Sequence, residues 1–352
     1  MMDRRTSRIT IEDIAKMAGV SKTTVSRVIN DKPDVHPRTR QRINDLIAEY
    51  NFCPNLFATG KTSHKINHIG LIVPYTTSSI LSNQFYVGVL QGILDEVERR
   101  DHYLLFCYVQ QTNYREIYEQ KRVEGFILLS PAALHHSIIR ELQTANIPFV
   151  CTAKVMNEPD IPYIDIDNIK GAQIAVEYLL SLGHRKIAFA GKPALSSNHD
   201  RLLGYKQTLN GNNIQVNEDY IQTVEVSSVE TGYAMMMNLL DLDDPPTAVF
   251  SSCDVMAFGA IKAIHEKGLS VPEDISIIGF DDIPLSRNMS PGLTTVRQPA
   301  VEKGSLAASQ LIDYLVNGKE LVTRILDVEL IVRDSTGPVK RNERVPEKGG
   351  DG

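Results

Sequence analysis

Arg201 and Asp281 are the residues of this chain whose chemical types and positions best suit ligand binding. Arg201 follows an apolar run at 186–191, and Asp281 directly follows another at 275–280. If both runs are parallel strands, the two side chains lie beyond their carboxyl ends, where open sheets bind ligands. A guanidinium and a carboxylate facing one cleft form bidentate hydrogen bonds with a polyol, which predicts a small neutral carbohydrate. Arg201 could instead pair with a surface acid.

Two aromatic residues and two further aspartates are weaker candidates for lining this cleft. Phe85 and Tyr86 follow the first expected strand and its loop, where a ring can pack on the C–H face of a sugar. They are equally consistent with the hydrophobic core. Asp254 follows the run at 247–252 and is interpreted as a structural cap on the next helix. Asp282 is expected to be exposed beside its neighbour.

Near the N-terminus, polar and basic side chains share one side of a short expected helix that runs from Lys22 to about Asn30. Lys22 and Arg27 can donate hydrogen bonds to guanine, and Thr23 can contact a base or a thymine methyl group. The other polar side chains suit phosphates, which position a protein without specifying sequence. These are Thr24, Ser26 and Asn30. A solvated helix face is the alternative interpretation of the whole set.

Helical periodicity predicts the elements that would position these residues. In 11–18, apolar residues recur every three or four positions, Thr10 can cap the start, and Gly19-Val20 ends the helix. Ser21 can cap the second helix, and a third helix after Pro37 would close the core. Two short helices joined by a tight turn match the helix-turn-helix pattern, in which the second helix enters the major groove of DNA.

Beyond residue 67, short apolar runs alternate with amphipathic stretches. This alternation predicts two lobes, each a doubly wound parallel sheet, with a cleft between them. The expected strands are 69–74, 103–109, 125–130, 147–152, 163–167, 186–191, 220–226, 247–252 and 275–280. The expected helices are 85–100, 134–145, 169–182, 229–242, 254–267 and 300–316. The predicted fold class is therefore a small all-α head followed by an α/β body.

The net charge of −6 is unevenly distributed along the chain. Residues 1–65 hold 12 Lys+Arg and 7 Asp+Glu, whereas the remainder holds 25 and 36. A basic head on an acidic body predicts a polyanion partner for the head alone. No apolar run approaches the roughly 18 residues of a membrane span, and the first residues lack the apolar core of a signal peptide. Four scattered cysteines without CxxC spacing predict reduced thiols in a cytoplasmic protein: Cys53, Cys107, Cys151 and Cys253.

Neither catalysis nor a metal or other cofactor is predicted. His135-His136 are adjacent and lack a third zinc ligand, the aspartates before Pro245-Pro246 lack a calcium-loop pattern, and no nucleophile elbow is present. Gly60-Lys61-Thr62 matches the end of a phosphate-binding loop, but Asn55 stands where that loop needs a glycine. The polar tail at 336–352 is expected to be disordered.

The head resembles the DNA-binding domain of the lactose/galactose repressor (LacI/GalR) family. The resemblance rests on ITIEDIAKMAGVSKTTVSRVIN, with its VSxxTVSRVxN core, and on the later FCPNLFA. It implies that Lys22, Thr23 and Arg27 read bases in the major groove. It also implies that Pro54-Asn55 opens a hinge helix that forms on the operator, and that Ala58 contacts the minor groove.

One hinge position departs from the family pattern. The family commonly has a leucine seven residues after the hinge proline, and that leucine wedges between base steps. Here the position holds Lys61, which can bind a phosphate but cannot act as an apolar wedge. Leu56 and Phe57 are the nearest apolar candidates if the register is shifted.

The resemblance extends over the body and implies a periplasmic-binding-protein-like fold of type I. It implies that Arg201 and Asp281 hold the effector, and that Phe85, Tyr86 and Ser227 line the pocket in some members. The matching landmarks are GHRKIA at 183–188, RLxGY at 201–205, PTAVF at 246–250, DxMAxG at 254–259, VPxDISxIGFDD at 271–282 and LTTV at 293–296.

The resemblance implies a transcriptional repressor that binds a palindromic double-stranded DNA operator and is controlled by a small-molecule effector. No C-terminal leucine heptad is present, so a homodimer is expected rather than a tetramer. Induction by the effector is favoured over corepression. The alternatives are a regulator responsive to a purine or another metabolite, an exported sugar-binding transport protein, and an enzyme with a regulatory head.

Pattern and resemblance together predict the following divisions of the chain. They are a helix-turn-helix domain at 8–52, a hinge at 53–67, an effector-binding and dimerisation domain at 68–335, and the tail at 336–352. Within the body, the N-lobe is expected at about 68–162 and 293–322, and the C-lobe at about 163–291 and 323–335.

Overall fold

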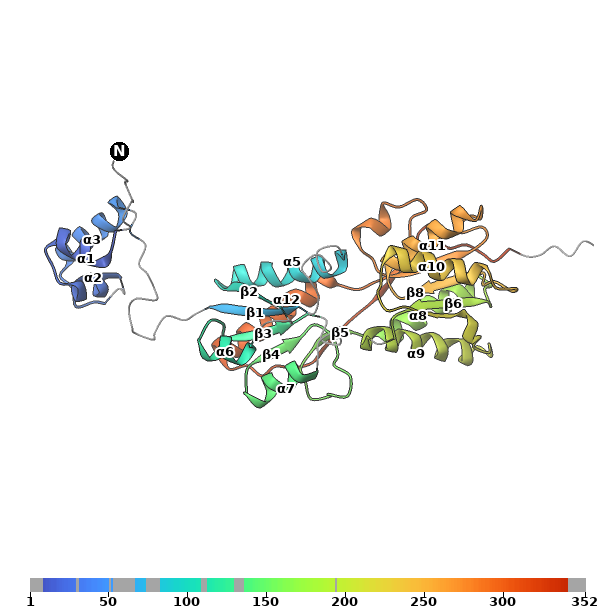
Figure 1. Ribbon diagram of the computed structural model, residues 1–352, viewed down its shortest axis with the longest axis horizontal. Helices are drawn as coiled ribbons and strands as arrows, with labels where there is room; N and C mark the ends of the chain where they lie inside the picture. The colour runs from blue at the N-terminus through green and yellow to red at the C-terminus, as the bar shows by residue number, and fades with distance from the viewer. Residues whose placement is uncertain are drawn as a thin grey trace, which may run out of the picture. The chain divides into compact units, whose positions relative to one another are not determined.

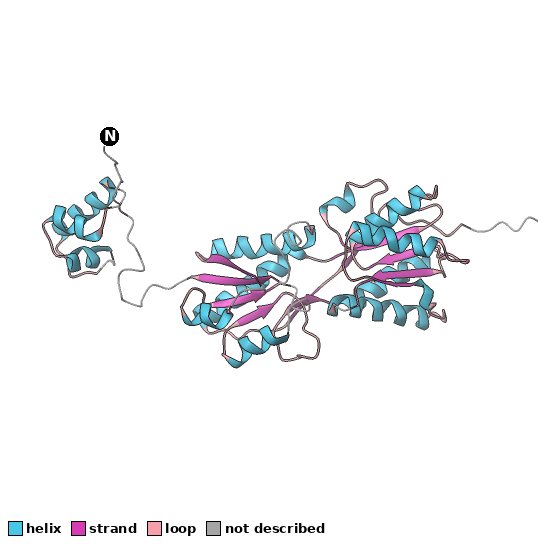
Figure 2. Cartoon of the chain, viewed as in Figure 1, coloured by secondary structure: helices cyan, strands magenta, loops and turns pink. Residues whose placement is uncertain are grey.

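The computed structural model describes residues 9–29, 32–50, 52, 67–73, 83–108, 113–129, 136–193 and 195–340 (Figures 1 and 2). The chain forms two compact units, residues 1–65 and 66–352. Four of the residues predicted to contact DNA lie outside the described residues. These are Asn30, Asn55, Ala58 and Lys61.

The N-terminal unit contains three helices, α1 (Ile11–Ala18), α2 (Lys22–Ile29) and α3 (Pro37–Glu49). Thr10 caps α1 through a reciprocal capping box with Asp13, as the sequence predicts. Gly19 ends α1 with φ of 65°, a conformation that glycine adopts without steric cost. Ser21 Oγ accepts a hydrogen bond from Thr24 N at 3.1 Å, which caps α2.

A small apolar core holds the three helices together. Val25 and Val28 of α2 are buried in it, which turns the opposite side of that helix to solvent. The buried members of the core are Ile14, Ala15, Ala18, Val25, Val28, Val35, Ile43 and Phe52. The predicted three-helix head is thereby confirmed.

The first lobe of the body is built on a four-stranded parallel sheet with strand order β2-β1-β3-β4. The strands are β1 (His68–Val73), β2 (Tyr103–Tyr108), β3 (Gly125–Leu128) and β4 (Phe149–Cys151). Helices α5 (Gln84–Arg99) and α12 (Ala300–Asn317) cover one face, and α6 (Tyr114–Glu119) and α7 (His136–Thr144) cover the other (Figure 1).

Helices α5 and α12 pack very closely. A Cβ atom on Gly92 would lie 1.9 Å from the carbonyl oxygen of Val301, and one on Gly304 would lie 1.9 Å from that of Val89. Only glycine at both positions permits this separation. A displacement of one helix is therefore transmitted to the other.

The second lobe contains a six-stranded sheet with strand order β12-β10-β9-β8-β6-β7. Its strands are β6 (Ile187–Gly191), β7 (Ile221–Thr223), β8 (Ala248–Ser251), β9 (Ser276–Asp281), β10 (Thr294–Arg297) and β12 (Glu329–Ile331). Helices α8 (Asn168–Ser181) and α9 (Ser196–Gly211) cover one face, and α10 (Val229–Leu240) and α11 (Asp254–Glu266) the other (Figure 1). Short 3₁₀ helices lie at η2 (Glu218–Tyr220) and η3 (Pro284–Arg287).

Two details of the body differ from the expected divisions. β10 pairs in parallel with β9, so residues 294–297 belong to the second lobe rather than the first, and only α12 beyond them packs on the first lobe. β5 (Ile164–Ile166) and β11 (Arg324–Leu326) pair only with one another, as a separate parallel ribbon. Strand pairing depends on partners distant in sequence, which local periodicity does not reveal.

The start of the expected disordered tail is in fact bound to the second lobe. Val339 N donates to Leu182 O at 3.1 Å, and Thr336 Oγ1 lies 2.9 Å from Thr294 Oγ1. His184 also holds this segment, because its Nε2 lies 3.0 Å from the carbonyl oxygen of Gly337. Polar composition predicts disorder, but hydrogen bonds from backbone and side chains of the lobe hold residues 336–340.

His184 should make the stability of the body depend on pH. A carbonyl can only accept, so Nε2 carries the proton and Nδ1 accepts from the Thr247 hydroxyl at 2.9 Å. Burial lowers the pKa of His184, so its stabilising contribution is present above about pH 6.5 and is lost as the unfolded chain binds a proton below that. We expect His184→Gln to destabilise the chain by about 1–3 kcal/mol at pH 8 and by less at pH 5, measured by urea unfolding. An equal loss at both values would contradict the assignment.

Candidate functional site

Arg201, on α9, is buried and held on several sides. Its Nε donates to Asn168 Oδ1 at 2.9 Å, and its Nη1 donates to the carbonyl oxygen of Ser252 at 2.5 Å. The guanidinium carbon lies 3.5 Å from the ring centroid of Phe280, a cation–π arrangement. Burial lowers the pKa of Arg201, and the charge of Asp281 opposes that effect. The guanidinium is therefore fixed in place by groups of the protein itself.

Asp281 ends β9 and is brought to Arg201, as the sequence predicts for residues beyond the carboxyl ends of strands in one parallel sheet. Its Oδ1 lies 3.8 Å from Arg201 Nη1 and accepts a hydrogen bond from Gln298 Nε2 at 2.5 Å. Burial raises the pKa of Asp281 to about 6, with Arg201 as the main opposing charge. The backbone φ of Asp281 is 122°, which L residues rarely adopt. Such strain persists where the surroundings enforce it, often at functional sites.

Asp254 is fully buried, but it does not cap the helix that it begins, contrary to the sequence-based interpretation. It accepts hydrogen bonds from Ile283 N at 2.9 Å, Ser286 Oγ at 2.7 Å and Thr295 Oγ1 at 2.5 Å. Burial is the main reason that its pKa is raised. Its role is structural, because it fixes the loop that follows Asp281.

Asp282 was expected to be exposed, yet its side chain is only 8% exposed. Its Oδ2 lies 2.7 Å from Arg297 Nε, and its Oδ1 lies 2.6 Å from Arg333 Nη2. Arg333 comes from the segment after β12, so sequence distance concealed the partner. Asp282 thus joins the end of β9 to the returning chain.

The predicted pocket-lining residues are not all brought together. Phe85 and Tyr86 begin α5, with ring centroids 5.4 Å apart, and Phe85 packs against the cores of both lobes. Ser227 is half-buried just before α10. Among the described residues, it makes no hydrogen bond to Arg201 or Asp281. Ser227 therefore has weaker structural support as a ligand residue than the aromatic pair.

Three polar residues of the site were missed from the sequence: Asn168, Ser252 and Gln298. Asn168 lies two residues after β5 and Ser252 directly follows β8, so the strand-end rule could have found them. Gln298 sits between β10 and α12, where no strand was predicted. Ser252 Oγ and Gln298 Oε1 are buried and, among the described residues, have no hydrogen-bond partner. A buried polar atom without a partner is costly, which points to a ligand that supplies one.

A groove of about 870 Å³ opens at the Arg201–Asp281 site, because Phe85, Asp281 and Gln298 are among the residues that line it. It is lined on one side by Gln84, Val87 and Gln91 of α5, and on another by the first turns of α12. Val87 and Val301, one on each helix, are 38% and 43% exposed. The groove therefore presents an apolar surface built from both helices of the tightly packed pair.

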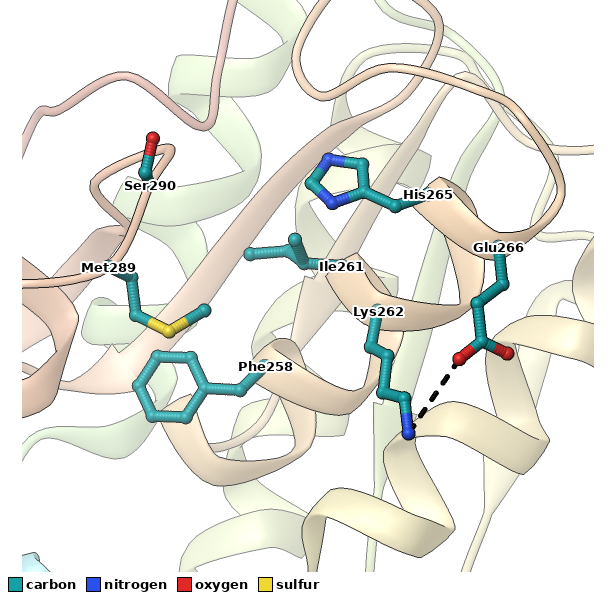
Figure 3. A pocket seen from close by; sticks show the side chains of 7 residues that line it. All are labelled: Phe258, Ile261, Lys262, His265, Glu266, Met289 and Ser290. Atoms are coloured by element: carbon teal, nitrogen blue, oxygen red, sulfur yellow. Dashed lines mark ion pairs between the residues drawn. The ribbon is translucent and has the colours of Figure 1, made fainter.

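A smaller hollow of about 360 Å³ lies on α11. Figure 3 shows the side chains of Phe258 and Met289 next to one another, with Lys262 and Glu266 paired at the side. The Lys262–Glu266 ion pair spans 3.7 Å and is exposed to solvent. An apolar centre with a charged rim is typical of a protein contact surface.

In the head, the predicted base-reading residues are exposed on one side of α2. Lys22 is paired with Glu12, and Arg27 Nη2 lies 3.0 Å from Asp34 Oδ2. Both basic side chains remain more than half exposed. Exposed pairs of this kind contribute about 0–1 kcal/mol, so a nucleic acid can replace the acidic partners at small cost. Thr23 is exposed beside them.

Within the described residues, no group of three or more His, Cys, Asp or Glu side chains is placed to hold a metal ion. No helix in that part of the chain is long and apolar enough to cross a membrane.

Two family models match the chain. A model described as "Bacterial regulatory proteins, lacI family" matches residues 10–55, and one described as "Periplasmic binding protein-like domain" matches residues 176–336. The "Probable HTH-type transcriptional repressor ExuR" of Bacillus subtilis is 35% identical over 93% of this chain and 98% of its own length. The "HTH-type transcriptional repressor CytR" of Escherichia coli is 34% identical over 93% and 96%. These relatives are transcriptional regulators.

Solved structures agree with these matches. The Lac repressor dimer bound to operator and the anti-inducer ONPF is 28% identical, covers 94% of this chain and 100% of its own, and has a TM-score of 0.80. The complex of the transcriptional regulator CelR with cellobiose is 29% identical, covers 93% and 100%, and has a TM-score of 0.71.

Proposed function

The chain belongs to the lacI family of bacterial regulatory proteins, and we propose that it is a transcriptional repressor whose operator binding is controlled by a small carbohydrate held between its lobes. The observation that carries this proposal is the coexistence of an exposed basic face on α2 with the buried Arg201–Asp281 site. The basic face suits binding to DNA, and the buried Arg201–Asp281 site suits binding to a neutral polyol.

On the DNA side, Lys22, Thr23 and Arg27 contact base edges, and Thr24 and Ser26 contact phosphates. The buried Val25 and Val28 fix the orientation of α2, so its polar face is presented without rearrangement. Asn30, Asn55, Ala58 and Lys61 retain the DNA contacts expected from the sequence. In the relative bound to operator, the protein is a dimer. Two heads related by a two-fold axis require a palindromic operator.

On the ligand side, the two buried oxygen atoms without a hydrogen-bond partner indicate which hydrogen-bonding groups the ligand carries. Gln298 Oε1 can only accept, so the ligand must donate a hydrogen bond to it. Ser252 Oγ can donate or accept. Arg201 supplies donors, Asp281 supplies acceptors, and Phe85 offers a ring for the C–H face of a sugar. Adjacent hydroxyl groups satisfy this arrangement better than a flat nucleobase, whose faces require stacking.

Two experiments test the proposal separately. Sequencing the DNA fragments selected by the purified chain should yield a palindrome, and random fragments would overturn the repressor assignment. Calorimetry of the full chain against D-glucose, D-galactose, D-ribose, cellobiose, adenine and guanine should give heat with one of the sugars. Saturable binding of a nucleobase, without binding of any sugar, would show that the effector is a purine and not a sugar.

The groove at α5 and α12, together with the hollow on α11, supports a homodimer. Exposed apolar side chains gather on the elements around the groove, where a second copy can cover them. They are Val87 and Leu94 on α5, Leu285 on η3 and Val301 on α12.

We expect Val301→Arg to dissociate the dimer, because a charge would be buried in the contact. Operator affinity should fall roughly 100-fold, since the two heads no longer bind as one unit. Analytical ultracentrifugation and fluorescence anisotropy measure the two effects. Val316→Arg is the matched control: Val316 is 46% exposed near the other end of α12, outside the groove. Dissociation by both variants, or by neither, would contradict this placement of the contact.

A further inference from the structure

Asp165, in the middle of β5, accepts hydrogen bonds from separate parts of the body. Its Oδ1 accepts from Lys303 Nζ at 2.8 Å and from Ile166 N at 2.9 Å, and its Oδ2 accepts from Lys154 N at 3.0 Å. Lys154 lies just after β4 of the first lobe, and Lys303 lies in the first turns of α12, just after β10 of the second lobe. The carboxylate thus joins the connections by which the chain passes between the lobes.

Lys303 is unusual because its side chain is almost wholly buried, with 5% exposure. Lysines are rarely buried unless they are paired, and a buried pair needs good geometry to offset its desolvation. Its Nζ lies 5.7 Å from the ring centroid of Phe85, which contacts the cores of both lobes. Val301 and Glu302, on the same helical turn, line the groove against α5. One turn of α12 therefore reaches the interlobe connections and the proposed dimer surface.

The same ion pair is electrostatically linked to the ligand site. Asp165 is among the charges that raise the pKa of Arg201, and Lys303 is among those that lower the pKa of Asp281. A covalent route runs in parallel, because Gln298, which donates to Asp281, shortly precedes Lys303 in the chain. A ligand that changes the arrangement of Arg201 and Asp281 must therefore act on the Lys303–Asp165 pair as well.

We propose that Lys303 and Asp165 are positioning residues that set the orientation of the two lobes and pass ligand occupancy to the α5–α12 pair. This inference rests on the proposed function, because it assigns the pair a part in its regulation. The close contacts at Gly92 and Gly304 make α5 follow α12. A change in the position of Lys303 then alters the α5–α12 surface on which the second copy is proposed to bind.

The test compares lobe orientation in the full chain without any sugar. The exposed residues Gln143 on α7 and Asn210 on α9 are each replaced by a keto amino acid, to which a dye is attached. Single-molecule fluorescence resonance energy transfer between the two dyes then reports the distance between the lobes. The double variant Lys303→Met with Asp165→Asn removes both charges together, so no buried charge is left unpaired. We expect it to fold, to show a shifted or broadened transfer peak, and to change affinity for the selected operator at least fivefold.

The matched control is Lys267→Met with Asp241→Asn. That pair has the same residue types and the same 2.8 Å separation, but it is exposed and lies within one lobe. It should leave the transfer peak and the operator affinity unchanged. An unchanged peak and unchanged affinity in the Lys303–Asp165 variant would overturn the proposal.

If the double variant does not fold, Lys303→Gln decides the question, since glutamine can still donate to Asp165. It should shift or broaden the transfer peak relative to the wild type, and a peak identical to that of the wild type would overturn the proposal. Because no sugar is present in the transfer measurement, a failure to find a binding sugar affects the proposed function only.

Discussion

Replacing Arg27 by alanine is expected to remove most specific operator binding while leaving the head folded. Arg27 is 55% exposed and makes no part of the head's buried core, so the three helices should persist. A bidentate contact to guanine contributes about 1–3 kcal/mol of discrimination, and a dimer makes two such contacts. The expected loss is therefore about 2–6 kcal/mol, or at least 30-fold in affinity. Fluorescence anisotropy with the selected operator measures it.

Comparing the loss of affinity for operator and for scrambled DNA shows whether Arg27 contacts a base or only a phosphate. Affinity for a scrambled duplex should fall much less, because that binding depends on phosphate contacts. Lys206→Ala, which also removes a positive charge but lies on α9 in the body and pairs with Glu218, should leave operator affinity unchanged. Equal losses on operator and scrambled DNA would make Arg27 a phosphate contact instead.

The head could be predicted almost completely from its sequence because its determinants are local. Thr10, Gly19 and Ser21 act on the helix next to them, and the burial of Val25 and Val28 follows from helical spacing. The predicted orientation of α2 therefore agrees with the described structure. Asn30, Asn55, Ala58 and Lys61 lie outside the described residues, and their roles stay predictions.

The body was predictable at the level of alternating strands and helices, but less so where distant segments meet. The strand-end rule brought Arg201 and Asp281 together correctly. Asp254 is structural as expected, but the capping role expected of it and the exposure expected of Asp282 were wrong, because their partners lie in the loop after β9 and in the returning chain. Lys303 looked like any polar residue of an amphipathic helix. Its burial depends on the contact with β5, which periodicity does not reveal.

Replacing Asp281 by asparagine should produce a repressor that binds its operator but no longer responds to sugar. Hydrogen bonds to a charged carboxylate contribute about 1.5–3 kcal/mol each, so losing two of them weakens sugar binding at least 100-fold. The fold should tolerate the change. Burial already disfavours the ionised carboxyl, as its raised pKa indicates, and Arg201 keeps its hydrogen bonds to Asn168 and Ser252. Calorimetry measures the sugar affinity.

The response to sugar follows from thermodynamic linkage, because the sugar alters operator affinity by the same factor as the operator alters sugar affinity. At a sugar concentration that saturates the wild type, the Asp281→Asn variant should therefore keep its sugar-free operator affinity. Asp282→Asn is the neighbouring control: its partners are Arg297 and Arg333, so it should lower stability yet retain sugar binding within a few-fold. If Asp281→Asn binds sugar as the wild type does, the carboxylate is not a ligand contact. Its strained backbone and its hydrogen bond from Gln298 would then serve only to hold the end of β9 against the start of α12.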